Sequence, residues 1–271
     1  MMLLPVIVCV WTRTTSAQWT MGSRAVAMGQ AHSALPNDAW ALFHNPAALD
    51  TANRTLGFFA IRYYGLKELE DHAFVLNLPL QHLFSSFGIS TALGFGMHTY
   101  GFELFRRTQA RLGWSARMNR FHLGVAACYV HLGIEGYGSR GSPVFDAGVI
   151  GELSGHFHVG YRISHLLHTG NGENEADLHP SEMAGGFSWT GISGLLITAD
   201  VVKDLIHPVA LRAGIEAELP GNLFIRGGWT SRPFTWSAGA GIGLDRMEGN
   251  AAVQKHEVLG LSPGIDLTIR I

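Results

Sequence analysis

Beyond residue 50, apolar residues recur at every second position of the chain, opposite a face of polar or small residues. Between 209 and 219, for example, Leu211, Ile215 and Leu219 alternate with Arg212 and Glu216. A period of two is that of a β-strand, whose side chains point to opposite faces in turn. The clearest alternating windows are 109–118, 156–164, 209–219, 223–230, 234–244 and 265–271. The pattern predicts a protein built largely of amphipathic strands.

The longer windows and their polar faces favour strands that cross a membrane. Several windows reach nine to eleven residues. A tilted strand needs about 9–11 residues to cross a bilayer, whereas strands of globular proteins average about 5–6. The polar face holds Gly, Ser, Thr and Arg, and the only lysines of the chain are Lys67, Lys203 and Lys255. Such a face suits a crowded barrel lumen in which charges pair across the interior.

The charged side chains expected to face this lumen are Arg111, Arg117, Arg162, Arg212, Glu216, Arg226 and Arg270.

Turn signals divide the region 54–271 into about fourteen strands. The last two strands are predicted at 251–261 and 263–271, and the long polar link 169–177 is the best candidate for an external loop. The fold class predicted is all-β, a transmembrane antiparallel β-barrel of about fourteen strands. No length remains for a second folded domain.

The N-terminus has the composition of a secretory leader. Leu3 to Trp11 form a short apolar run, polar residues follow to Ser16, and Ala17 offers a cleavage position. The run is too short for a transmembrane helix, which needs about 20 residues. We therefore expect residues 1–17 to be a cleaved signal peptide and the protein to reach the cell outer membrane.

Composition supports a surface that faces lipid. Charged residues make up 15% of the chain and glycine supplies 34 of its 271 residues, whereas soluble proteins average about 25% charged and about 7% glycine. The formal net charge is −2 and no run of Lys or Arg occurs. Nucleic acid is therefore excluded as an expected partner, because its phosphates call for a basic face.

Catalytic and metal-binding motifs are absent from the sequence. One of the two cysteines, Cys9, lies in the leader and Cys128 would remain alone, so neither a disulfide nor a cysteine-based zinc site is expected. His156 and His158 share a strand face, but no acidic residue or cysteine is spaced with them as in a known metal site. No nucleophile elbow, phosphate-binding loop or zinc-protease motif is present. We expect no enzymatic activity, no metal and no cofactor.

Three segments near the N-terminus resemble a known family. The segments Gly22–Ala31, Asn37–Trp40 and Asn45–Leu49 are similar to the opening of PorV/PorQ-type proteins, which belong to the FadL-like outer-membrane superfamily. Leu211–Gly214 and Leu259–Leu261 agree with the closing pattern of that family. The resemblance implies a fourteen-stranded barrel, filled by an N-terminal hatch, or plug, over residues 18–53.

The resemblance also implies the hatch or gating residues, which are Asn37, Asp38, Asn45, Pro46 and Ala47. Asn45-Pro46-Ala47 suits a compact chain reversal, because Asn can bond its own backbone and Pro fixes φ. Asn37-Asp38 ahead of Ala39 suits the N-cap of a short helical turn.

The function expected is transport or translocation across the outer membrane, with small hydrophobic molecules passing a hatch-gated barrel. Passage could occur by rearrangement of the hatch or through a lateral gap between strands. The first alternative is an accessory or shuttle component of a type IX-like protein secretion system. The second is a soluble periplasmic β-sandwich that binds a ligand. Expected partners are outer-membrane lipid, the barrel-insertion machinery, and either secretion-system proteins or a hydrophobic ligand.

Overall fold

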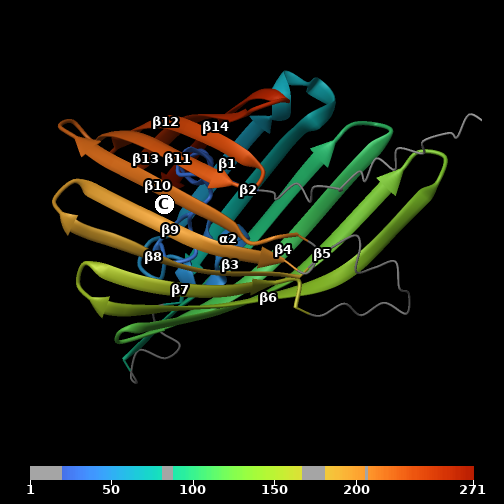
Figure 1. Cartoon of the computed structure of the whole chain (residues 1–271). Helices are drawn as coiled ribbons and strands as arrows, with labels where there is room; N and C mark the ends of the chain where they lie inside the picture. The colour runs from blue at the N-terminus through green and yellow to red at the C-terminus, as the bar shows by residue number, and fades with distance from the viewer. Residues whose placement is uncertain (1–19, 81–87, 167–180, 205–206) are drawn as a thin grey trace, which may run out of the picture.

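Fourteen antiparallel strands form a closed barrel in the computed structural model, which describes residues 20–80, 88–166, 181–204 and 207–271 (Figure 1). Each strand pairs with its neighbours in sequence, and β1 closes the barrel by pairing with β14, for example at Phe58 and Leu267. The predicted all-β class and the strand number are confirmed. Within the described residues, no helix is both long and apolar enough to cross a bilayer.

The strands are β1 (Thr55–Arg62), β2 (Glu70–Pro79), β3 (Ile89–Gly101), β4 (Phe105–Met118), β5 (Phe121–Ile134), β6 (Gly138–Ser154), β7 (Phe157–Ser164), β8 (Glu182–Ile192), β9 (Leu195–Asp204), β10 (Ala210–Leu219), β11 (Leu223–Ser231), β12 (Phe234–Leu244), β13 (Met247–His256) and β14 (Gly260–Arg270). The short helices are α1 (Ser23–Ala27), α2 (Ala41–His44), η1 (Pro46–Ala48), η2 (Tyr63–Gly65) and η3 (Lys67–Leu69).

The barrel is apolar outside and polar inside. On β10, Leu211 and Ile215 are each 47% exposed on the outer surface, while the residues that follow them, Arg212 and Glu216, are buried. Large exposed apolar side chains recur around the barrel, as on β5 and β12. Apolar surface on this scale is unfavourable in water and suits hydrocarbon. A closed barrel with this exterior rules out the soluble β-sandwich.

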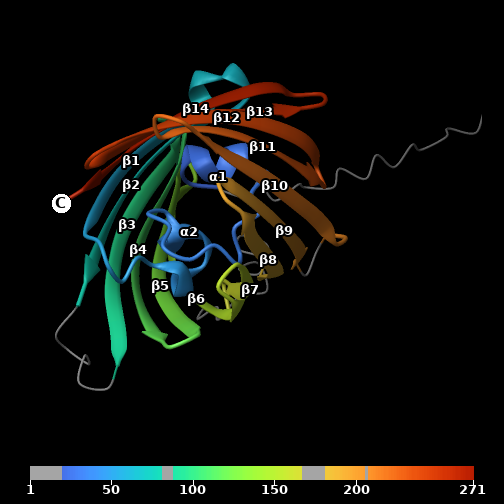
Figure 2. The same cartoon turned by 90° about the vertical axis from the view of Figure 1, so that its left-hand side faces the viewer.

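The N-terminal segment, residues 20–54, lies inside the barrel, and we call it the plug (Figure 2). Helix α1 packs on β11 to β14, α2 on β3 and β4, and η1 on β4 to β6. Most plug residues are buried, including Met21, Leu42 and Leu49. The expected leader 1–17 and the expected loop 169–177 lie outside the described residues.

The last two strands begin at other residues than predicted. β13 and β14 begin at Met247 and Gly260, so the turn lies at 257–259 rather than near 262. The residues Glu248, Gly249 and Asn250 have the composition of a turn, yet they pair with β12 in a regular register. Asn250 is held there because its side chain is buried and hydrogen-bonded inside the barrel.

Glycines on the inner face let the plug backbone and side chains approach the wall. A Cβ at Gly124 would collide with the Pro46–Ala47 backbone, and a Cβ at Gly148 with the Asn45 side chain. The inward glycines that meet the plug in this way are Gly57, Gly94, Gly96, Gly113, Gly124, Gly148, Gly160, Gly214, Gly228 and Gly239. The high glycine content therefore has a structural use, since a wall of larger residues would exclude the plug.

Neighbouring glycines on β11 test this contact directly. A Cβ at Gly228 would overlap the Met28–Gly29 backbone, whereas one at Gly227 would meet only ordinary contacts such as Ile215 Cγ2 at 3.8 Å. We expect Gly228→Val to lower the free energy of unfolding by about 3 kcal/mol or more, because overpacking against backbone cannot relax easily. Gly227→Val is the matched control and should change it far less. Urea unfolding of both variants in lipid bilayers measures this, and equal losses would contradict a role for plug contact.

Candidate functional site

An ion-pair network joins α1 of the plug to the barrel wall. The Arg24 guanidinium donates to both oxygens of Glu216 on β10, from Nε at 2.8 Å and from Nη2 at 2.7 Å. Arg226 on β11 donates from Nε to Glu216 Oε2 at 2.5 Å. A single buried carboxylate thus binds one arginine from the plug and one from the wall. Forked pairs of this type combine charge with fixed geometry.

The network continues around the inner wall and returns to α1. Arg226 Nη1 donates to Asn250 Oδ1 at 2.5 Å, and Asn250 Nδ2 donates to Asp266 Oδ1 at 2.9 Å. The other oxygen of Asp266 accepts from the backbone N–H of Ser23, the first residue of α1. Both ends of the connection therefore lie on α1, which is fixed to β10, β11, β13 and β14.

Asp200 on β9 anchors the next part of the plug. Its Oδ2 accepts from His32 N at 2.9 Å, Ser33 N at 3.0 Å and Ser33 Oγ at 2.8 Å. Ser188 Oγ on β8 donates to Ala34 O at 2.9 Å. These barrel side chains replace the partners that the plug backbone would have in a helix or sheet, so the segment can be buried without regular structure.

The Asn45-Pro46-Ala47 turn forms a compact corner against β5 and β6. Asn45 is fully buried; its Oδ1 accepts from Ala47 N at 3.1 Å and its Nδ2 donates to Ser33 O at 2.7 Å. Pro46 begins η1 with no N–H to satisfy. The asparagine thereby joins two separate parts of the plug.

Asp38 and Asn37 do not cap a helix as predicted. The N-cap of α2 is Trp40, and no side chain caps it. Asp38 Oδ1 instead accepts from Trp40 N at 2.7 Å, an Asx-type turn ahead of the helix, and Asp38 Oδ2 lies 3.4 Å from Arg24 Nη1. Asn37 is exposed with a φ of 59°, a left-handed position that Asn tolerates.

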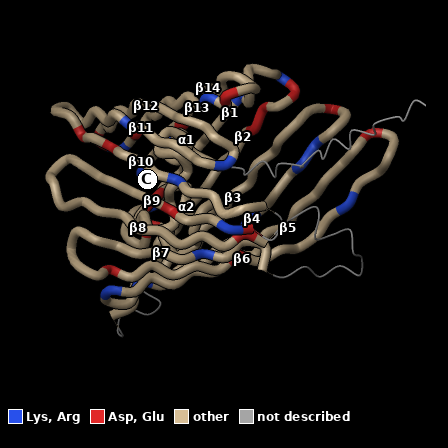
Figure 3. The backbone as a smooth tube through the Cα atoms, in the orientation of Figure 1, with Lys and Arg blue, Asp and Glu red and all other residues tan. Residues whose placement is uncertain are grey.

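The other charged residues expected in the lumen divide into two groups. Arg111 is buried beside Asp146 at 2.5 Å, and Arg162 is buried beside Glu182 at 2.5 Å. Arg117 and Arg270 occupy inward positions of their strands near the strand ends, where Arg117 is partly buried. Arg270 is exposed, which corrects its placement in the closed lumen. Strand periodicity gives the direction of a side chain but not its depth. Figure 3 shows that most of the chain carries uncharged residues, with Lys, Arg, Asp and Glu at scattered positions.

Sequence reasoning missed several partners of these residues. Arg24, Asp146, Asn250 and Asp266 complete the pairs and networks, although none was singled out as a site residue. The available signal was the requirement that a buried arginine have a carboxylate partner. Which carboxylate it pairs with depends on where the plug lies, and that information is absent from strand periodicity.

Two histidines stack in the middle of the plug. The His32 and His44 rings lie 5.2 Å apart at an angle of 27°, and His44 Nε2 lies 2.7 Å from Met21 O. Burial lowers the pKa of both imidazoles, and the pKa of His32 is lowered further because a proton on it would be repelled by one on the adjacent His44. Both rings are therefore neutral at pH 7. Among the described residues, no group of three or more His, Cys, Asp or Glu side chains is arranged to hold a metal ion.

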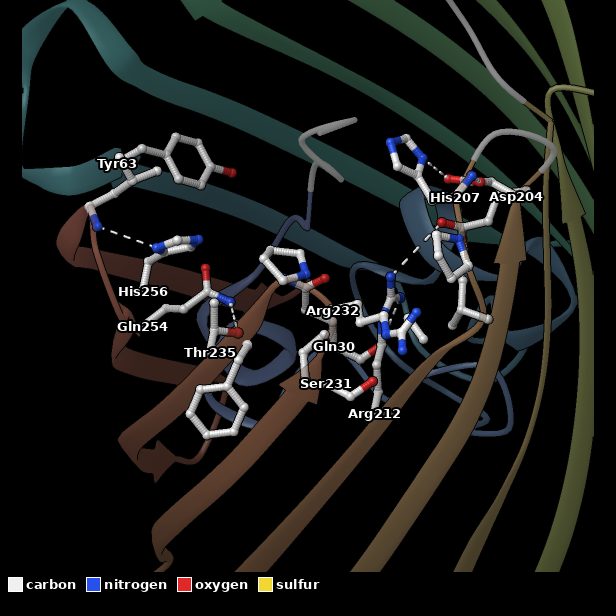
Figure 4. A pocket seen from close by; sticks show the side chains of 18 of the residues that line it. Gln30, Tyr63, Asp204, His207, Arg212, Ser231, Arg232, Thr235, Gln254 and His256 are labelled. Carbon is white, nitrogen blue, oxygen red and sulfur yellow. Dashed lines mark hydrogen bonds and ion pairs between the residues drawn. The ribbon is translucent and has the colours of Figure 1, made fainter. Parts of the chain in front are cut away.

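A cavity of about 390 Å³ lies above the plug at one mouth of the barrel (Figure 4). Tyr63, Tyr64 and Tyr100 line one side, and Gln30 of the plug contributes to the lining. The rings of Tyr63 and Tyr100 lie 6.1 Å apart, edge to face. Burial raises the pKa of Tyr63 and Tyr64, so their hydroxyls remain protonated.

The other side of this cavity is polar. Arg212 is buried, Glu182 is partly buried at the start of β8, and Asp204, its cross-strand neighbour, pairs with His207, with Oδ2 2.7 Å from Nδ1. Thr230, Thr235, Gln254 and His256 add further polar groups to the lining. The cavity thus has an aromatic side, a polar side and contact with the plug, which suits reversible binding of a small organic molecule.

Comparisons with known proteins show which known fold the barrel shares. No protein-family model matches the chain, and no curated protein matches it in sequence. A FadL homologue of Pseudomonas aeruginosa is structurally similar, with a TM-score of 0.60 and 12% identity, over 93% of this chain and 98% of that one. The toluene transporter TodX of Pseudomonas putida is also similar, with a TM-score of 0.58 and 11% identity, over 91% of this chain and 96% of that one. The monoaromatic hydrocarbon channel CymD has a TM-score of 0.65 and 12% identity, over 93% of this chain and 97% of that one. The chain therefore shares the FadL-like barrel fold.

Removing the shared carboxylate tests the anchor of α1. Glu216→Gln leaves the buried Arg226 and the partly buried Arg24 without their common counter-charge, and breaking a buried pair in this way costs about 3–5 kcal/mol. We expect faster proteolysis of the plug and a lower free energy of unfolding. Glu218→Gln, at an exposed position of the same strand, is the control. Unchanged protease protection in Glu216→Gln would show that the network does not hold the plug.

The stacked histidines predict a loss of stability in acid. Both are neutral in the folded protein but take up protons in the unfolded chain below their ordinary pKa of about 6.5. The unfolded state then binds more protons, so stability falls as the pH drops from 7 to 5, by at most about 1.4 kcal/mol per pH unit for each histidine. In the double variant His32→Gln, His44→Gln, the free energy of unfolding should depend less steeply on pH between 7 and 5. An unchanged slope would assign the acid sensitivity to other groups.

Proposed function

We propose that this protein is a non-enzymatic outer-membrane channel that passes small hydrophobic compounds. The observation that carries the proposal is the aromatic-sided cavity at one barrel mouth, in direct contact with the plug at Gln30. A solute that enters from this mouth meets a binding surface first and the plug next. The structural similarity to a toluene transporter and a hydrocarbon channel supports the same use.

We assign the cavity to the extracellular side. Arg54 and Ile271, where the barrel wall begins and ends, lie at the opposite end, joined by a hydrogen bond from Ile271 N to Arg54 O at 2.9 Å. The connections at that end include the short turns 119–120, 155–156 and 245–246. Short turns face the periplasm in outer-membrane barrels. We also propose that the protein is exported with a cleaved leader, is inserted by the barrel-insertion machinery and contacts outer-membrane lipid.

Two routes lead onward from the cavity. One requires the plug to rearrange; the other leaves the barrel sideways through the wall. The sideways route is supported at β6, which pairs with β7 only from Ala147 onward. Among the described strands, Gly138–Val144 of β6 pair with β5 alone, while Phe145 O accepts from the N–H of Leu166, just beyond β7, at 2.7 Å. The many contacts of the plug with the wall favour this route over removal of the whole plug.

A role as an accessory or shuttle component of a type IX-like secretion system is the second candidate. Its support is the resemblance of Gly22–Ala31 and Asn45–Leu49 to PorV/PorQ-type proteins, since these residues build α1 and the Asn45 corner. Purification from native outer membranes separates the two candidates. A stable partner protein favours the secretion role, and a bound small hydrophobic molecule favours the channel.

A disulfide between plug and wall tests both transport and gating. A Cβ on Gly239 would lie 2.6 Å from Ala27 Cβ, so the pair Ala27→Cys, Gly239→Cys can form a disulfide once α1 shifts by about 1 Å to the Cβ–Cβ distance of about 3.8 Å that a disulfide needs. We expect cells that express the protein to take up radiolabelled toluene faster than cells without it. If the plug moves as a body, oxidation of the double variant abolishes this uptake and reduction restores it.

The reduced double variant is the matched control for the oxidised one. Uptake that persists after complete crosslinking would reject motion of α1 and leave the sideways route. Equal uptake by cells with and without the protein would reject the channel itself.

A further inference from the structure

Arg212 is a buried guanidinium with an incomplete set of partners. It is 5% exposed and lines the cavity. Its Nη1 reaches Gln30 O only at 3.5 Å, and its Nη2 lies 3.9 Å from Glu182 Oε2, beyond hydrogen-bond distance. Its Nε has no hydrogen-bond partner. A guanidinium has five N–H donors, and leaving them unused in a buried site is costly.

The neighbouring carboxylates are bound to other groups. Glu182 Oε1 accepts from Arg162 at 2.5 Å, so one carboxylate serves two arginines. Asp204 binds His207 at the rim. Asp200, the cross-strand neighbour of Arg212, gives Oδ2 to the plug and leans toward Gly186 on β8, where a Cβ would collide with its Oδ1. Arg212 is thus the buried charged group of the cavity with donors to spare, whereas Arg232, which also lines the cavity, is exposed at the mouth.

The opposite side of the cavity suits a ring. Figure 4 shows Tyr63 and Arg212 on different sides of the space. Tyr63 and Tyr100 already meet edge to face, an arrangement that a further aromatic ring extends favourably. A volume of about 390 Å³ holds one or two fused rings together with a polar group.

We propose that the cavity binds an aromatic carboxylate, with the carboxylate on Arg212 and the ring system against Tyr63 and Tyr100. This inference rests on the proposed channel function and narrows its substrate class from bare hydrocarbons to compact aromatic acids. A carboxylate accepts two parallel hydrogen bonds from a guanidinium, which supplies the missing partners of Nε and one terminal nitrogen.

Binding of 2-naphthoate and of its neutral analogue 2-naphthylmethanol to the protein in lipid nanodiscs tests the proposal. Calorimetry at pH 7 should show that the wild-type protein binds the acid more tightly than the alcohol. Arg212→Gln should weaken naphthoate binding about tenfold or more, as expected for loss of a charged hydrogen bond, and naphthylmethanol binding less than about threefold. Because Glu182 keeps Arg162, this variant retains the nearest ion pair.

Arg246→Gln, which removes an exposed positive charge at the opposite end of the barrel, controls for overall charge and should bind naphthoate as the wild type does. Equal weakening of both ligands by Arg212→Gln, or no weakening of naphthoate, would overturn the proposal. If the wild-type protein binds the alcohol and transports toluene but shows no preference for the acid, this inference fails and the channel function stands. If it neither binds either ligand nor transports toluene, both fail.

Discussion

The close contact between the plug and a wall lined by glycine determines how the rest of the interior is built. At Gly124 and Gly228 the plug backbone occupies space that any side chain would need. Chain that lies so near the wall cannot be hydrated, so its N–H and C=O groups require partners from the barrel. Ser237 supplies one, accepting from Gly29 N at 3.2 Å and donating to Ala27 O at 3.0 Å. The contact thus explains both the glycines and the small hydroxyl residues of the inner face.

The same contact explains why arginine and carboxylates dominate the interior. An interior without bulk water penalises unpaired charge, and a flexible ammonium would have to be fixed by several acceptors. The planar guanidinium of Arg24 binds both oxygens of Glu216 at once, which leaves Arg226 to bind the same carboxylate from the wall. Charge is therefore concentrated in a few connected groups. This distribution accounts for a low charged fraction in a chain with many buried ion pairs.

The sequence predicted those features that follow from local periodicity. Leu211 and Arg212 point to opposite faces because successive side chains of a strand alternate, and the same alternation of exposed apolar and buried polar residues is found around the barrel. Periodicity could not place Arg270 along the barrel axis, nor recognise that Glu248–Asn250 continue a strand, because both depend on contacts distant in sequence. The partners Asp266 and Ser23 are separated by 243 positions. Only the position of the plug brings such residues together, and alternation carries no signal of it.

The position of the cavity follows from where the contact between plug and wall ends. Gly29 is enclosed by β10 and β11, and its carbonyl oxygen accepts from Thr230 Oγ1 at 2.9 Å, whereas Gln30, the next residue, faces the cavity. The weak bond from Arg212 Nη1 to Gln30 O, at 3.5 Å, is the connection between this part of the plug and the polar side of the cavity. Any acceptor that enters the cavity competes with Gln30 O for the same guanidinium. Ligand recognition and plug attachment therefore share a donor, so the free energy of one depends on the other.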